Sequence, residues 1–385
     1  MIKQIKYFLG HNIINTLGWH SNRKIIVIES DDWGSIRMPS IEILHKLIDK
    51  RLKFNLELGY DKYDTIASQS DLENLFEVLN SVHDQSQHPA VITANTVTAN
   101  PDYEKIKSSG FSTYHYELIT ETLKNYYPQA DPFVVWKQGI EGRVFHPQFH
   151  GREHLNVRLW LNLLRKNING AREAFDETVF TQVMNISDDN RVNVLAAYDY
   201  QDQSEQQFIK NSIVEGLHIF ERLFGYRSAS AISPCYVWDD FVEKCFDDEG
   251  VKFIQGSFFQ SYPTYQKERK NKKRQFHFSG EKNKNAQYYL VRNCFFEPSQ
   301  YPNTDYVDDC LHRIKIAFRW KKPAIISAHR LNFIGALDVS NRDRNLKSLS
   351  TLLHHILEKW PDAEFMTSDQ LGFMMLNKQS NKNIL

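Results

Sequence analysis

The sequence has few cysteines, and they show no pairing pattern. The four thiols are scattered along 385 residues without a CxxC pair, at Cys235, Cys245, Cys294 and Cys310. This spacing disfavours a disulfide framework and predicts buried free thiols in a reducing compartment.

Net charge and long apolar runs are also missing. The 47 basic residues balance the 47 acidic ones, so no global attraction to nucleic acid or to an anionic membrane is implied. No stretch approaches the roughly 18 consecutive apolar residues of a membrane span. Residues 1–20 lack the pattern of a signal peptide. We therefore expect a cytoplasmic protein with no membrane span and no nucleic-acid partner, whose oligomeric state the sequence leaves open.

The chain does contain an alternation of short apolar segments with longer helical patterns. A capping box of Ser204 and Gln207 predicts a helix that ends at Gly225, and two further helices are expected near 304–321 and 342–360. Alternating strands and helices indicate a parallel α/β sheet or barrel. Without an internal repeat or a long linker, a single domain with insertions is favoured. The expected strands cover residues 25–28, 90–94, 143–149, 192–197, 228–232, 252–254, 288–292, 324–328 and 364–367.

One segment departs from this alternation. Residues 267–274 are strongly basic and, with the residues that follow them, predict a hairpin with solvated ends. Charge runs are usually solvated. A flexible exposed loop is therefore favoured over an arm that binds phosphate or an anionic glycan.

Two adjacent carboxylates follow the first predicted strand. Asp31 and Asp32 come directly after the apolar residues 25–28. The context Asp-Asp-Trp-Gly-Ser equally permits a structural turn or a helix cap. The functional interpretation assigns one carboxylate to a metal ion and the other to a general base, because a nearby cation would keep both ionised.

Three histidines lie four residues apart, at His146, His150 and His154. Pro147 prevents a regular helix through His146, which leaves that residue on the strand as a candidate for supporting the site. His150 and His154 are expected on one face of the helical turn that begins the next helix, where both can bind one metal ion. Two histidines and a carboxylate commonly hold zinc with a position left open for water.

Polar side chains also end other predicted strands, as in an α/β barrel whose catalytic groups gather at the carboxyl ends of its strands. His329 follows residues 324–328, with Arg330 beside it. A satisfied structural histidine and a general acid remain equally open for His329 on this basis.

These residues resemble the motifs of the polysaccharide deacetylases, also called NodB-like proteins or carbohydrate esterase family four. Asp31-Asp32 is similar to the family's paired aspartates, and Ser327–His329 is similar to its final Leu-His. His150–His154 is similar to its H-[ST]-x-x-H motif, with Gly151 replacing the Ser or Thr. Ile232–Tyr236 matches its R-x-P-[YF] motif only in part, because Ile232 stands where the family has arginine.

The resemblance implies a distorted (β/α) barrel of about seven strands, with inserted loops near 35–89, 160–226 and 260–290 and a β-hairpin. It implies a zinc-type ion held by Asp32, His150 and His154. Asp31 would be the catalytic base and His329 the catalytic acid in the removal of an acetyl group from an N- or O-acetylated sugar. The side chains expected to flank the sugar or support the site are Trp33, Tyr236, Trp238, His146 and Arg330.

Two other functions stay open. An inactive barrel could bind a glycan or a partner protein, since Ile232 replaces the motif's arginine. A metal-independent glycoside hydrolase could use a pair of carboxylates, with Glu29, Glu141 or Glu297 as candidates.

Overall fold

The centre of the molecule is a sheet of nine strands, and every pairing within it is parallel. The structure is a computed structural model that describes residues 10, 12–54, 56–181, 184–187, 190–265, 274–301 and 304–380. The strand order is β12-β9-β8-β5-β2-β1-β14-β13, and β15 pairs with the first half of β1. The strands are β1 (Lys24–Trp33), β2 (Ile92–Thr96), β5 (Phe145–Phe149), β8 (Ser230–Ile232), β9 (Phe253–Gly256), β12 (Tyr288–Val291), β13 (Cys294–Phe295), β14 (Ala324–His329) and β15 (Ala363–Met366).

The sheet closes on itself at one seam. Strands β12 and β13 lie at opposite ends of the strand order, yet only two residues separate them in the chain. At those two residues, Arg292 N donates a hydrogen bond to the carbonyl oxygen of Gly256, the last residue of β9, and Asn293 N donates to Ile325 O in β14. The predicted distorted barrel is therefore confirmed. Seven strands form its main wall, and the two-residue β13 and the off-path β15 add to them.

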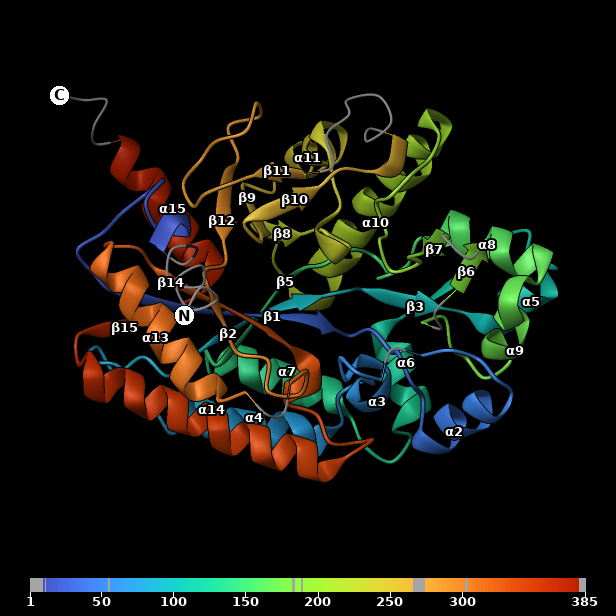
Figure 1. Ribbon diagram of the computed structural model, residues 1–385, viewed down its shortest axis with the longest axis horizontal. Coiled ribbons are helices and arrows are strands. Elements are labelled where there is room, and N and C mark those ends of the chain that lie inside the picture. Colours follow the sequence, from blue (N-terminus) through green and yellow to red (C-terminus); the bar gives the residue numbers. More distant parts are fainter. Residues whose placement is uncertain are drawn as a thin grey trace.

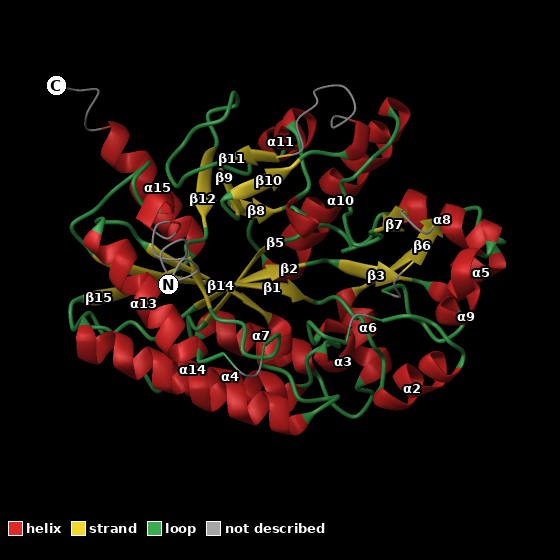
Figure 2. Cartoon of the chain, viewed as in Figure 1, coloured by secondary structure: helices red, strands yellow, loops and turns green. Residues whose placement is uncertain are grey.

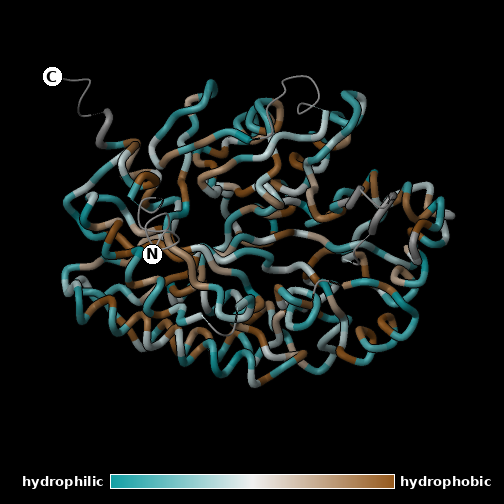
Figure 3. Tube along the Cα trace, in the orientation of Figure 1, coloured by the Kyte–Doolittle hydropathy of each residue, from teal (hydrophilic) through white to brown (hydrophobic). Residues whose placement is uncertain are grey.

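Helices cover the outside of the barrel (Figure 1, Figure 2). Against β1, β2 and β14 pack α4 (Gln69–Asn80), α7 (Pro132–Glu141), α13 (Tyr306–Arg319) and α14 (Val339–Lys359). Against β5, β8 and β9 pack α10 (Gln206–Phe224) and α11 (Asp240–Asp248). Hydrophobic and hydrophilic residues alternate along these helices (Figure 3), as expected of helices with one face on a core.

The inside of the barrel is apolar at one end and polar at the other. At the amino-terminal ends of the strands, Ile25 and Val27 pack with Leu371 and Met375 of α15 (Ser368–Ser380). Towards the carboxyl ends the enclosed side chains are polar and hydrogen-bonded to one another, for example Asn95 Nδ2 to Gln255 Oε1 at 2.8 Å. Buried polar groups require such partners. These buried polar side chains are Glu29, Asn95, Gln148, Ser230, Gln255, Arg292 and Ser327.

Three connecting segments gather beyond the carboxyl ends of the strands, on the right of Figure 1. We call residues 35–68, 97–127 and 151–205 together the cap region. It contains α2 (Ile41–Asp49), α3 (Tyr60–Tyr63), β3 (Ala99–Pro101), α5 (Tyr103–Ser108), β4 (Tyr116–Leu118), α6 (Ile119–Tyr126), α8 (Val157–Lys166), α9 (Ala171–Phe175), β6 (Met184–Ser187) and β7 (Asn190–Val192).

Two local predictions are wrong. Residues 193–197 form turns rather than a strand, because the Asn193 side chain accepts the Leu195 N–H two residues later. The capping box of Ser204 and Gln207 does not form. Asp202 instead accepts the Ser204 N–H and starts a 3₁₀ turn ahead of α10, which ends before Gly225 as expected.

The other sequence expectations concern loops and thiols. The basic residues 267–273 lie outside the described part of the chain, but β10 (Phe259–Ser261) and β11 (Arg274–Phe276) form the predicted antiparallel hairpin around them. All four cysteines are free, and three of them are buried. Among the described residues, none of the helices has the length and apolar character needed to cross a bilayer.

Candidate metal-binding active site

Asp31 and Asp32 reach the same cavity because β1 bulges where they lie. In a regular strand, neighbouring side chains point to opposite faces. Between Ser30 and Trp33 the register of β1 against β2 shifts, and Asp32 has a φ of 73°, a left-handed conformation that aspartate adopts more readily than most residues. The bulge re-aims the second carboxylate, and both aspartates line one cavity.

His150 and His154 lie in the loop between β5 and α8 rather than on a helix, which corrects the predicted helical turn. The helix α8 begins only after Asn156, whose side chain caps it. Gly151 has a φ of 103°, a conformation that ends any helical turn and favours glycine. A Cβ at this position would lie 3.0 Å from the Glu153 carbonyl oxygen, which explains why no Ser or Thr stands there.

Hydrogen bonds to neighbouring segments hold this loop in place. His150 N donates to the carbonyl oxygen of Thr96 at the end of β2. The Arg152 carbonyl oxygen accepts hydrogen bonds from the backbone N–H groups of Thr98 and Ala99. The Arg152 guanidinium also binds Glu153, with Nε 2.6 Å from Oε2. These contacts fix the backbone on both sides of Gly151 and keep the two imidazoles inside the molecule.

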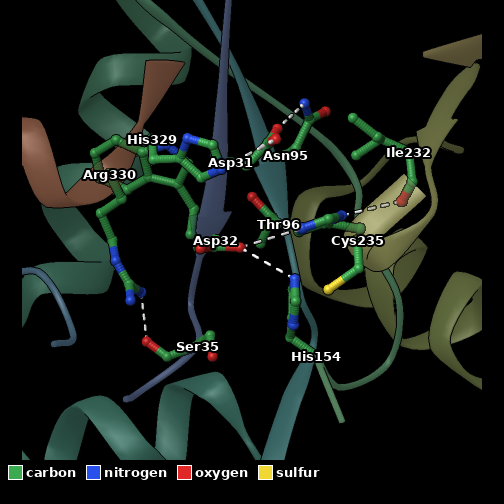
Figure 4. A network of polar contacts seen from close by, with 12 residues as sticks. Asp31, Asp32, Ser35, Asn95, Thr96, His154, Ile232, Cys235, His329 and Arg330 are labelled. Carbon is green, nitrogen blue, oxygen red and sulfur yellow. Dashed lines mark hydrogen bonds and ion pairs between the residues drawn. The ribbon is translucent and has the colours of Figure 1, made fainter. Parts of the chain in front are cut away.

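The side chains of Asp32, His150 and His154 converge on one point. One ligand atom from each lies within 4.8 Å of the others, and Asp32 Oδ1 is 3.3 Å from both Nε2 atoms. Figure 4 shows the contact between Asp32 and His154. The cluster could bind a metal ion, since a carboxylate and two imidazoles form a common zinc-binding set.

The hydrogen bonding of His150 also fits a metal ion. His150 Nδ1 lies 3.0 Å from the Ile232 carbonyl oxygen, which can only accept, so Nδ1 carries the proton. In the neutral imidazole that metals bind, the Nε2 lone pair then faces Asp32 Oδ1, and a cation between the two atoms would satisfy both acceptors. Burial lowers the pKa of His154 to about 3, which keeps this imidazole in the neutral form that metals bind.

Arg37 takes the other oxygen of Asp32. Its Nη2 lies 2.9 Å from Asp32 Oδ2 and its Nε lies 2.9 Å from Asp64 Oδ2. Asp64 in turn pairs with Arg330, whose Nη2 lies 2.7 Å from Asp64 Oδ1, while Arg330 Nη1 donates to the Ser35 carbonyl oxygen (Figure 4). Burial alone would raise the pKa of Asp32, but Arg37 holds it well below its usual range. Arg330 thus supports Asp32 indirectly, through Asp64 and Arg37 and through the backbone of Ser35.

Arg292, from the seam of the barrel, clamps Asp31. Its two terminal nitrogens each lie 2.6 Å from one oxygen of Asp31, and its Nε lies 2.6 Å from Glu29 Oε2. Asn95 Nδ2 donates a further hydrogen bond to Asp31 Oδ1 (Figure 4). Burial would raise the pKa of Asp31, but Arg292 outweighs it and keeps this carboxyl ionised. An arginine thus orients Asp31 although Ile232 occupies the motif's arginine position.

His329 lies beside Asp31, its register partner on the neighbouring strand β14, and is held by a carboxylate behind it. Its Nε2 is 3.8 Å from Asp31 Oδ2, and its Nδ1 is 2.5 Å from Glu297 Oε1. The Tyr60 ring packs edge-on against the imidazole. Burial lowers the pKa of His329, but the charge of Glu297 prevails and raises it to about 9. His329 is therefore a proton donor at neutral pH.

The cavity that joins these groups has a volume of about 520 Å³. Tyr236 lines it, and its hydroxyl accepts a hydrogen bond from Arg292 Nη1 at 3.1 Å. The lining also includes residues from the cap region. The full lining is Asp31, Asp32, Arg37, Leu58, Tyr60, Asp61, His150, His154, Thr181, Asn193, Val194, Leu195, Ile232, Ser233, Cys235, Tyr236 and His329.

Two of the three aromatic side chains expected to flank a sugar lie elsewhere. Trp33 is 1% exposed and packs edge-on against Trp136 in the core outside β1. Trp238 is also 1% exposed and stacks on His277. Bulky rings that bury so much apolar surface contribute to the core. Only Tyr236 remains as a candidate for substrate contact.

His146 does not support the metal cluster. It stacks on Tyr226, and its Nε2 lies 3.2 Å from Asp369 Oδ1 in α15. A second cavity, near the amino-terminal ends of the strands, is lined by His146 and Asp369. Because His146 is the second residue of β5 while His150 follows its end, most of the strand separates the two imidazoles.

The glutamates proposed for a glycoside hydrolase do not line the cavity. Glu29 is fully buried behind Arg292, Glu297 lies behind His329, and Glu141 is an exposed residue at the end of α7. A pair of catalytic carboxylates must reach the sugar from both sides. The structure therefore contradicts these assignments.

Sequence reasoning missed Arg292 and Arg37, and it named Glu297 only as a possible glycosidase carboxylate and not as the partner of His329. Arg292 and Asp31 are separated by 261 residues, and no motif spacing connects positions so far apart. The one available signal was that Arg292 is the last residue of the predicted strand 288–292, at the end where other strands carry their reactive residues.

Comparison with models of protein families finds no match, and comparison with curated proteins finds none either. Several solved structures share features of the fold. A presumed polysaccharide deacetylase from Mycobacterium smegmatis has 8% identity and a TM-score of 0.45, over 94% of this chain and 94% of that one. A 4-alpha-glucanotransferase from Thermococcus litoralis has 10% identity and a TM-score of 0.47, over 92% of this chain and 40% of that one. A pseudoenzyme of carbohydrate esterase family four from Bacillus anthracis has 10% identity and a TM-score of 0.37, over 91% of this chain and 66% of that one. These similarities are too distant to assign a family or an activity.

Proposed function

We propose that this protein is a metal-dependent hydrolase that removes acetyl groups from an N- or O-acetylated sugar or glycan precursor. One observation carries the proposal. The cluster of Asp32, His150 and His154 shares a cavity with an ionised carboxylate, Asp31, and a protonated imidazole, His329. Hydrolysis of an amide or ester needs both a proton acceptor and a proton donor beside the reacting carbonyl.

Each residue has a separate task in this proposal. A divalent metal ion, proposed to be zinc, would polarise the acetyl carbonyl and lower the pKa of a water molecule when bound by the three ligands. Asp31, oriented by Arg292, accepts the proton of the attacking water. His329, kept charged by Glu297, donates a proton to the departing sugar nitrogen or oxygen. Tyr236 lies where it can contact the sugar.

The wider expectations from the sequence are retained as proposals. The four free thiols suit a cytoplasmic location. A single closed barrel, with a cap region built from its own connecting segments, suits a single domain that spans residues 1–385. The substrate would then be an intracellular acetylated sugar.

Metal analysis of the purified protein tests the proposal first. We expect about one bound divalent ion per chain, lost in Asp32→Ala and in His150→Ala. His146→Ala is the matched control and should keep the ion, because His146 lies at the other end of β5. A wild-type protein that binds no divalent metal at micromolar supply would contradict the proposal.

Acetate release then separates an enzyme from a glycan-binding barrel. Wild-type protein loaded with zinc should release acetate from acetylated sugars, and Asp31→Asn should abolish the release while keeping the metal. Retained metal without acetate release from any acetylated mono- or oligosaccharide in the wild type would favour the inactive binding protein instead.

A further inference from the structure

We infer that the cavity accepts a single acetylated sugar unit, either free or at the end of a chain, and excludes the internal units of a long polysaccharide. This inference rests on the proposed deacetylase function and concerns the shape of the same site. It follows from the way in which the cap region walls the metal cluster.

Two segments of the cap region form opposite walls of the cavity. Leu58, Tyr60 and Asp61 line it from residues 35–68, and Val194 and Leu195 line it from residues 151–205. The metal cluster and Asp31 form its floor at the carboxyl ends of the strands. A cavity of about 520 Å³ falls within the roughly 300–1,000 Å³ typical of small-molecule sites, so the walls leave room for a small ligand.

The two walls are joined to each other on one side. Leu44 and Leu47 of α2 share a buried apolar cluster with Ala174 of α9 and with Val179. Leu44 is 2% exposed, and the other three are fully buried. Thr181, two residues after Val179, lines the cavity, so this packed joint between the two segments adjoins one of its walls.

Polar contacts brace the same joint. Lys46 Nζ of α2 lies 2.6 Å from Glu177 Oε1. The third segment of the cap region also binds the first, because Tyr127 OH donates a hydrogen bond to the Ile66 carbonyl oxygen at 2.7 Å. All three segments of the cap region are thus fastened to one another beyond the strands, as the right side of Figure 1 shows.

Each wall is also fastened beside the site. Tyr60 accepts a hydrogen bond from Gln300 Nε2 at 2.9 Å, and the Arg37 guanidinium lies over its ring. On the opposite wall, the Val194 carbonyl oxygen accepts the Asn156 N–H at 2.6 Å. Segments with this many fixed contacts are expected to open less readily than the mobile loops of a fold.

A polysaccharide that presents an internal unit must extend from the site in two directions. A chain that left the cavity past the joint would have to part α2 from α9, whereas a chain end needs only one exit. The indole rings that could have lined an open groove, Trp33 and Trp238, are buried in the core. The geometry therefore fits a terminal or single sugar unit.

Position-resolved deacetylation tests this inference. Acetylated hexosamines would be supplied as single units and as six-unit chains labelled at one end, and mass spectrometry would locate each lost acetyl group. We expect loss from end units only, with the rate per molecule for the six-unit chain within about threefold of that for the single unit. Comparable loss from internal units would overturn the inference while leaving the deacetylase function intact.

Absence of acetate release from every substrate would overturn the proposed function instead. Equilibrium binding of the same sugars to the zinc-loaded wild type, measured by calorimetry, then decides the shape of the site. Similar affinity for single units and six-unit chains is expected. Affinity that is tenfold or more higher for the longer chains, or no binding of the single units, would overturn the inference.

A pair of matched variants tests the joint itself. Val179→Ala loosens the cluster between α2 and α9, whereas Val251→Ala removes the same two methyl groups from a site 1% exposed next to α11, away from the cap region. We expect Val179→Ala to raise the ratio of internal to terminal deacetylation at least threefold and Val251→Ala to leave it unchanged. An unchanged ratio in both variants would contradict the role of the joint.

Discussion

The two sides of the site begin from neighbouring aspartates but are built differently. On the Asp31 side, Arg292 occupies both carboxylate oxygens and is itself fully buried. On the Asp32 side, Arg37 occupies one oxygen, lines the cavity and leaves the other oxygen facing two histidines. Each arginine is balanced by a second acid, Glu29 or Asp64. Ion pairing with arginine thus fixes both oxygens of Asp31, whereas it fixes one oxygen of Asp32 and leaves the other facing the two histidines.

Loss of Arg292 should give the largest effect, because it removes the cation that pairs with both Glu29 and Asp31 inside the barrel. We expect Arg292→Met to lower the free energy of unfolding by about 3–5 kcal/mol, the usual cost of a buried charge left without its partner. Urea unfolding measures this, and acetate release should be lost in parallel. Arg292→Lys keeps the charge but not the bidentate geometry and should recover only part of the stability. A cost for Arg292→Met below about 1 kcal/mol would contradict the clamp.

Loss of Arg37 should cost less. Asp64 keeps its pairing with Arg330, and Asp32 would keep the proposed metal ion. Arg37→Met in zinc-loaded protein is therefore expected to lose about 2 kcal/mol or less, in the range of hydrogen bonds to charged groups. The comparison with Arg292→Met under the same urea titration is the test. Equal losses of unfolding free energy in the two variants would show that Arg37 and Arg292 contribute equally to stability.

The pKa of His329, the proposed proton donor, should depend more on Glu297 than on its other acidic neighbours, Asp31 and Asp32. His329 has a pKa raised to about 9, so activity that needs its proton should fall as the pH rises through about 9. Glu297→Gln removes the charge that raises this pKa, and the alkaline limb of the pH profile should move down by about one unit or more. His329 can be followed directly by NMR titration. A limb that stays in place would assign the proton donor to another group.

The same shift has a consequence for stability. The folded-state pKa of His329 lies above its unfolded value of about 6.5. Its contribution to stability is therefore fully present below about pH 6.5 and is lost as the pH rises through about 9. In Glu297→Gln this loss of stability should occur at lower pH, and unfolding measured across the range from pH 6 to 10 would show it.

The smallest effect is expected at Ile232. Only its backbone carbonyl holds His150, so Ile232→Val should cost about 0.5–1.5 kcal/mol for one buried methylene and leave zinc affinity within twofold. Competition with a zinc chelator measures the affinity. Weaker metal binding in Ile232→Val would mean that the side chain, and not the carbonyl, positions the imidazole.

The sequence predicted the barrel and the residues that meet in the metal cluster, but not the way in which they meet. Asp32, His150 and His154 do converge, although through a bulge and a loop containing Gly151 rather than through a helical turn. The spacing of four residues correctly identified the pair of histidines, but the helical turn predicted from it is wrong. Backbone conformations with positive φ at Asp32 and Gly151 depend on tertiary contacts that local periodicity does not report.

Long-range partners were beyond the reach of the sequence. Arg292 binds Asp31 and Glu297 binds His329 from another part of the chain, and neither residue belongs to a motif that identifies its partner. The opposite error affected Trp33, Trp238 and His146. Their neighbourhood in the sequence suggested the site, but strand alternation and the length of β5 place them in the core or at the other end of the barrel.

The seam of the barrel couples the closure of the barrel to the alignment of Asp31. The residue whose backbone binds the end of β9 at the seam also carries the guanidinium that aligns Asp31. A chain whose seam has opened would lose its aligned proton acceptor at the same moment. Partly assembled molecules should therefore be inactive rather than slow. The specific activity of a preparation should be proportional to its fraction of closed barrels.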